Sequence, residues 1–227
     1  MRRLITALTI TFFSLQANAL GLSDLSNADA SDGLKQALIQ GAGKAVGKLG
    51  AVDGFFKNPQ VKIPLPDSMK KAQKAMKMFG MGDQADDLVL KMNRAAEAAV
   101  PEAQALLVDS VKKMSVTDAK NILTGGDDAA TQYFKKTTSG PMAEKFLPIV
   151  KKATEKVQLA QQYDKFAAMG AQYGLVGKDQ ANLEQYVTQK ALDGVYLMMA
   201  QEEKAIRKDP VGQASGLVSK VFGAIGK

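Results

Sequence analysis

Residues 179–210 of the chain are DQANLEQYVTQKALDGVYLMMAQEEKAIRKDP. Apolar residues recur here at three- and four-residue spacing, and one set falls on a single stripe of a helix: Val187, Ala191, Val195 and Met198. Leu192 and Tyr196 add apolar residues on the opposite face, which indicates an interior position. Asp179 is a suitable capping residue, and Asp209-Pro210 ends the pattern because proline cannot continue a helix. The stretch predicts one helix of about 29 residues.

The rest of the sequence shows the same helical period, interrupted by capping residues, glycines and prolines. Residues 170–178 are expected to form a loop, and residues 211–225 a last apolar stripe that docks on the domain or on a membrane surface. The residues expected to begin or restart the other helices are Ser31 or Asp32, Asp67 or Ser68, Asp83, Pro101, Ser115, Asp127 or Asp128, and Pro141.

One segment departs from the helical period. Between about residues 51 and 66, Val61, Ile63 and Leu65 alternate with polar residues or proline, which is a period of two. The predicted fold class is therefore all-α: an irregular multi-helix bundle crossed by one extended strap (about residues 51–66). The alternation is compatible with one short strand in this strap.

The first nineteen residues have the pattern of a cleaved signal peptide. Arg2-Arg3 precede an apolar run over residues 4–15, and Ala17-Asn18-Ala19 places small residues at the −3 and −1 positions. The run is shorter than the roughly 20 apolar residues that span a bilayer. We expect an exported, periplasmic protein that starts at Leu20 after cleavage, with residues 20–227 forming a single helical domain.

The chain has no cysteine and no histidine. It therefore lacks disulfides and has no mature N-terminal cysteine for a lipid anchor. Zinc sites built on His or Cys, His-ligated haem, Ser-His-Asp triads and thiol nucleophiles are excluded for the same reason. We predict no cofactor and no metal site, and any catalysis would depend on Asp, Glu, Lys, Tyr, Ser or Thr.

The net charge of the chain is +7, which becomes +5 when Arg2 and Arg3 leave with the predicted signal peptide. Such a mildly basic surface is compatible with an anionic component of the cell envelope. The lysine pairs lie in helical patterns whose other face is apolar, as solvated helix faces do, and we predict no nucleic-acid partner. These pairs are Lys70-Lys71, Lys112-Lys113, Lys135-Lys136 and Lys151-Lys152.

Arginine is rare: after residue 19 the chain has 28 basic residues, of which 26 are lysine. The two arginines are Arg94 and Arg207, and each has glutamate nearby. The planar guanidinium suits bidentate contacts with carboxylates or phosphates, which an ammonium matches poorly. One interpretation is local pairing along each helix. The other is a single network, structural or anion-binding, that joins the two helices through Asn93, Arg94, Glu97, Glu202, Glu203 and Arg207.

Two further groups of residues admit a functional interpretation beside a structural one. Asp127 and Asp128 follow Gly125-Gly126 and precede a helix, where they are expected to act as caps or as a weak cation site. The aromatic residues of the second half are expected in the core, with a ligand cavity as the alternative: Tyr133, Phe134, Tyr163, Phe166, Tyr173 and Tyr186.

The chain resembles a bacterial family of exported proteins catalogued as domain of unknown function 4197. The resemblance is carried by stretches spread over the predicted mature chain, and it implies a secreted helical domain without assigning catalytic residues. These stretches are Lys62-Ile63-Pro64-Leu65-Pro66, Asn93-Arg94-Ala95-Ala96-Glu97, Asp118 to Leu123, Gly125 to Phe134, Tyr186 to Asp193, and Glu202 to Pro210.

Three functions are compatible with these observations. The first is a non-enzymatic periplasmic protein that binds an envelope protein or an anionic envelope component. The second is a carrier of an amphiphilic ligand in an apolar cavity with an arginine or lysine at its mouth. The third is a carboxylate-dependent hydrolase that uses Glu97, Glu202 or Asp128, which requires two carboxylates facing one cleft.

Overall fold

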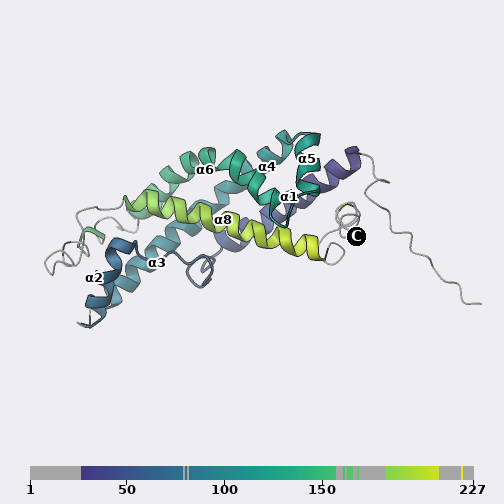
Figure 1. Cartoon of the computed structure of the whole chain (residues 1–227). Helices are drawn as coiled ribbons and strands as arrows, with labels where there is room; N and C mark the ends of the chain where they lie inside the picture. Colours follow the sequence, from purple (N-terminus) through teal and green to yellow (C-terminus); the bar gives the residue numbers. More distant parts are fainter. Residues whose placement is uncertain are drawn as a thin grey trace, which may run out of the picture.

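The architecture is seen in a computed structural model of the chain (Figure 1). The structure describes residues 27–78, 80, 82–156, 161, 163–165, 168, 182–209 and 221. Within these ranges the regular elements are helices and no strand occurs, which confirms the all-α prediction. Several predicted features lie outside the described residues: the signal peptide, the loop at 170–178, Asp179, Phe166, Tyr173, and residues 211–220 and 222–225 of the C-terminal stripe.

The longest helices form the body of the molecule. α8 packs along both α6 and α1, while α2 and α5 lie at opposite ends (Figure 1). The elements are α1 (Asn27–Gly50), α2 (Asp67–Met78), α3 (Gly82–Ala99), the short 3₁₀ helix η2 (Val100–Glu102), α4 (Ala103–Lys113), α5 (Val116–Leu123), α6 (Ala129–Lys156) and α8 (Leu183–Lys208).

The core forms around α8, as the helical period predicts. Its predicted stripe is buried throughout, from Val187 to Met198, and Leu192 and Tyr196 on the other face are buried as well. Phe134 and Phe146 of α6 are among the largest fully buried side chains. The aromatic residues of α6 and α8 thus belong mainly to the core. No helix among the described residues is long and apolar enough to cross a membrane.

Most helix boundaries follow the capping signals. Pro101 interrupts the chain between α3 and α4 through η2, and Ser115 and Asp118 form a reciprocal capping box at the start of α5. Two starts differ from prediction. α1 begins at Asn27, before Ser31, and the cap of α8 is Asn182, whose side chain accepts a hydrogen bond from the amide of Gln185.

The predicted restart at Pro141 is wrong, because α6 continues through both Pro141 and Pro148. A proline inside a helix costs about 3 kcal/mol. Burial of a large apolar side chain contributes about 1.5–3 kcal/mol, and Met142, Phe146 and Val150 are all fully buried after the first proline. Packing of these three side chains therefore outweighs the local preference for a break.

The strap over residues 51–66 is a series of turns followed by an extended segment, and it contains no strand. The alternation is nevertheless real, since Val61, Ile63 and Leu65 are buried. The ring of Phe55 is also fully buried, and it lies against Gly194 of α8. The apolar side chains of the strap thus pack into the bundle. Its backbone bonds within its own turns and to side chains of α3 and α8.

Gly194→Ala is expected to lower the free energy of unfolding by about 1–3 kcal/mol. A Cβ at this position would lie 2.7 Å from Cε1 of Phe55, inside contact distance of a ring that has no room to move. Urea denaturation measures the loss. Gly47→Ala is the matched control, because nothing lies within 4 Å of its Cβ position in α1. This control should gain up to about 1 kcal/mol from helix propensity, and an equal gain at Gly194 would contradict the prediction.

Candidate functional site

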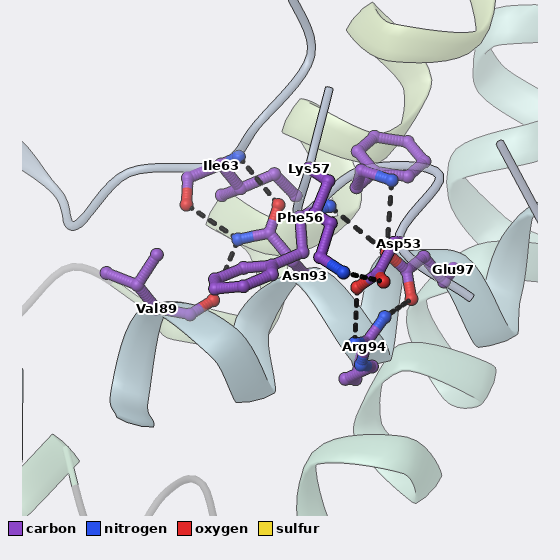
Figure 2. Close-up of polar contacts among 9 residues, drawn as sticks. Asp53, Phe56, Lys57, Ile63, Val89, Asn93, Arg94 and Glu97 are labelled. Atoms are coloured by element: carbon purple, nitrogen blue, oxygen red, sulfur yellow. Dashed lines mark hydrogen bonds and ion pairs between the residues drawn. The ribbon is translucent and has the colours of Figure 1, made fainter. Parts of the chain in front are cut away.

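The strap is held by side chains of α3, in an arrangement that we call the strap cluster (Asp53, Asn93, Arg94 and Glu97; Figure 2). Asn93 is fully buried and faces the backbone of Ile63. Its Oδ1 accepts the Ile63 amide at 2.8 Å, and its Nδ2 donates to the Ile63 carbonyl at 2.9 Å and to the Val89 carbonyl at 2.7 Å. The side-chain amide thereby replaces the partner strand that this segment lacks.

Glu97 binds the turn that precedes the extended segment. Its Oε1 accepts the amides of Phe55 at 3.0 Å and Phe56 at 3.1 Å. Its Oε2 accepts from Nη1 of Arg94 at 2.6 Å, and Nη2 of the same arginine donates to Oδ1 of Asp53 at 2.6 Å (Figure 2). The guanidinium bridges two carboxylates, as its fork geometry favours.

Asp53 is the strained residue of this turn, with a φ of 71° in the region that favours glycine. Hydrogen bonds from Lys57 and Arg94 lower the pKa of its carboxyl, which keeps the acceptor charged. Hydrogen bonds with Glu97 and Asp53 raise the pKa of Arg94. The charged contacts hold the left-handed residue in place.

The second arginine belongs to a separate arrangement, the turn cluster, which joins α8 to the α5–α6 connection. Glu203 accepts the amide of Ala130 at 2.9 Å and both the amide and the hydroxyl of Thr131 at 2.9 Å. Arg207 donates to Oε1 of Glu203 through Nε at 3.1 Å and Nη2 at 2.9 Å, and Nη2 also donates to the carbonyl of Ile122 at 2.8 Å. One ion pair therefore binds the end of α5 and the start of α6.

The charges of the turn cluster match the helix ends that they contact. The N-terminus of a helix carries partial positive charge and its C-terminus partial negative charge. Glu203 meets the first turn of α6, and Arg207 meets the last turn of α5. A carboxylate from a distant helix thus caps α6.

The prediction that Asp127 or Asp128 caps α6 through its side chain is corrected, because Glu203 takes the first-turn amides. Both aspartates are exposed, and the carboxylate of Asp128 accepts instead from the side chain of Gln132 at 2.9 Å. Over the described part of the chain, no group of three or more acidic side chains is placed to hold a metal ion.

Of the two interpretations of the arginines, the described contacts match local pairing and not a single network between α3 and α8. Among the described contacts, none joins Arg94 or Glu97 with the acidic residues of α8, and Glu202 instead forms an ion pair with Lys48 of α1. The strap cluster lies near Gly194, where Phe55 packs. Glu202 is eight residues farther along α8, a rise of about 12 Å. The local pairs are real, but the larger arrangement consists of two clusters.

A groove of about 490 Å³ lies between α4 and α6. Its lining combines apolar and hydroxyl groups with one ion pair, in which Nζ of Lys113 lies 2.7 Å from Oδ2 of Asp109. The lining residues are Leu106, Asp109, Ser110, Lys113, Tyr133, Thr137, Thr138 and Pro141. Of these, only Tyr133 is among the aromatic residues for which the sequence left a ligand cavity open.

Taken together, these features define an all-α domain in which carboxylates and an amide from neighbouring helices hold irregular connections. The chain belongs to the family described as "Protein of unknown function (DUF4197)", whose family model matches residues 24–223. No curated protein and no solved structure matches the chain.

Proposed function

We propose that this protein acts in the periplasm by binding another molecule, without catalysing a reaction. The observation that carries the proposal is the state of its buried carboxylates. Glu97, Glu202 and Glu203 have side chains 5%, 10% and 5% exposed, and each is engaged by backbone amides or by a cation. General acid–base or nucleophilic work requires a carboxylate that reaches the substrate.

The hydrolase alternative receives no support from these residues. The cavity that Glu203 touches has a volume of about 20 Å³. Such a space holds about one water molecule and no substrate. Asp128 is exposed on a turn and bound to Gln132.

Export to the periplasm is part of the proposal and is supported by residues 1–19. Arg2-Arg3, the short apolar run and Ala17-Asn18-Ala19 together meet the requirements of a signal peptide. The mature charge of +5 favours attraction to anionic components of the envelope.

A second candidate function, the carrier of an amphiphile, is favoured by the groove between α4 and α6. Its volume of about 490 Å³ is within the range of ligand pockets. Leu106 and Pro141 offer apolar surface, and the exposed Lys113 is among the lining residues, which supports this candidate.

Native mass spectrometry of the protein purified from its own envelope tests both functions. The expected spectrum shows a chain that begins at Leu20 and carries a reproducible additional mass. A small-molecule mass supports the carrier, and a co-purifying polypeptide that survives dilution supports the interaction protein. A chain that is always empty and alone contradicts both functions, and one that retains residues 1–19 contradicts export.

A further inference from the structure

In the groove between α4 and α6, the hydroxyl protons of the lining are used inside the protein, so its hydroxyl groups can act towards a ligand only as acceptors. A hydroxyl has one proton, and a carbonyl oxygen can only accept. Thr137 Oγ1 lies 2.9 Å from the Tyr133 carbonyl, so Thr137 donates there. Ser110 Oγ, 2.9 Å from Thr137 Oγ1, must then be the donor of that pair.

The same accounting applies to the other two hydroxyls of the lining. Thr138 donates to the Phe134 carbonyl at 2.7 Å. The Tyr196 hydroxyl, 2.9 Å from Thr138, must then donate to Thr138 and not to Sδ of Met142, a weak acceptor 3.5 Å away. Tyr133 donates to the Ser110 carbonyl at 3.4 Å. Oxygen lone pairs are therefore what the hydroxyl groups of the lining have left to offer a ligand.

Pro141 increases this surplus of acceptors. It lines the groove together with Thr137, which is four residues earlier in α6. Because proline has no amide proton, the Thr137 carbonyl cannot receive its usual hydrogen bond from residue 141. These acceptors favour a ligand that brings donors.

Two charged side chains line the groove, and their contact indicates which donor fits. The ammonium of Lys113 lies 2.7 Å from the carboxylate of Asp109, and its side chain is 75% exposed. A mobile lysine at the surface is readily displaced by a competing cation. The ring of Tyr133 in the same lining also attracts cations.

We propose that this groove binds an amphiphilic primary amine, with the ammonium on Asp109 and the acceptor-lined wall and the alkyl part along Leu106 and Pro141. The ligand ammonium takes the place of the Lys113 ammonium on Asp109. This inference rests on the proposed binding function and specifies the ligand of its carrier form.

Isothermal titration calorimetry at pH 7 with four probes of one chain length tests the ligand class. Octylammonium should bind with the highest affinity. Octyltrimethylammonium keeps the charge without N–H donors, octanol keeps a donor without charge, and octanoate reverses the charge, so each should bind more weakly. Octanoate binding as tightly as octylammonium, or no saturable binding of octylammonium, overturns the proposal.

Variants locate the site. Asp109→Asn should weaken octylammonium binding about tenfold, and Lys113→Met should strengthen it by removing the competing ammonium. Asp87→Asn is the matched control, since Asp87 and Lys91 form a pair of the same spacing on α3, 3.1 Å apart. Equal losses in Asp109→Asn and Asp87→Asn overturn the assignment to this groove.

Two further comparisons identify the source of the amine and show which of the two proposals has failed. Dihexanoyl phosphatidylethanolamine binding more tightly than octylammonium identifies a lipid headgroup as the source of the amine, and the reverse order identifies a free amine. A different ligand in native mass spectra, with no octylammonium binding, overturns this inference and leaves the binding function intact. Suppose that octylammonium binds saturably, while native mass spectra of the protein from its own envelope always show it without a ligand or partner. This pair of results overturns only the proposed function.

Discussion

Replacing Glu203 with alanine is expected to lower the free energy of unfolding by about 3–5 kcal/mol, as removal of one partner of a buried ion pair does. The substitution leaves the amides of Ala130 and Thr131 without their acceptor and Arg207, 11% exposed, without its carboxylate. Domains of this kind are stable by about 5–15 kcal/mol. Urea denaturation followed by circular dichroism measures the loss.

Two companion variants make the result specific. Asp193→Ala removes an exposed acidic residue from the same helix and should change stability by less than about 0.5 kcal/mol. Glu203→Gln keeps an acceptor oxygen and removes the charge, so it should be intermediate, and it reports on the site even where the alanine variant does not fold. A loss below about 1 kcal/mol in Glu203→Ala would show that the turn cluster does not secure α6.

Replacing Glu97 with alanine is expected to cost about 3 kcal/mol, since a buried amide without an acceptor costs about 1–3 kcal/mol. The amides of Phe55 and Phe56 both lose their acceptor, while Arg94 retains Asp53. Hydrogen exchange of these two amides gives a local measurement, and both should exchange faster than in the parent protein.

The control for Glu97 is Glu102, an exposed glutamate at the start of α4 whose side chain caps nothing. Glu102→Ala should leave both stability and amide exchange nearly unchanged. Unchanged protection of Phe55 and Phe56 in Glu97→Ala would contradict the assigned role of this carboxylate.

The sequence predicted the helices well because their determinants are local. Pro101 lacks an amide proton whatever the surrounding structure. Ser115 and Asp118 form a capping box within four residues. Pro141 was misjudged because the packing that overrides it comes from distant segments. The local sequence pattern shows that proline disfavours a helix. It does not show how much stability the packing of the surrounding core adds.

Sequence spacing predicted the local ion pairs of the two clusters but not their other connections, and Asp53 of the strap cluster was not among the predicted residues. The scarcity of arginine correctly selected Arg94 and Arg207, and spacing correctly paired each with a glutamate on its own helix. Most of the other partners are backbone groups far away in sequence, such as the Ile122 carbonyl, 85 positions from Arg207. Asp53, the second carboxylate bound by Arg94, is 41 positions away. Backbone groups carry no residue-specific signal, so periodicity could not reveal them.

The groove was missed for a related reason. Asp109, Lys113 and Ser110 lie on α4 with ordinary surface spacing, and Thr137 lies on α6. Only the packing of the two helices brings them together. The run Thr137-Thr138-Ser139-Gly140-Pro141 was the one available signal, because clustered hydroxyls before a proline bend a helix and bond to its carbonyls.

The turn cluster also affects the order in which the parts of this polypeptide fold. Glu203 emerges from the ribosome more than 70 residues after Ala130 and Thr131, whose amides it caps. The interval between α1, which contains Lys48, and this part of α8 is even longer. Contacts between such remote positions form late. A nascent chain that ends before α8 has no acceptor for these amides, and its early helices lose the surface on which they pack. Completion of the native state therefore waits until α8 has been synthesised.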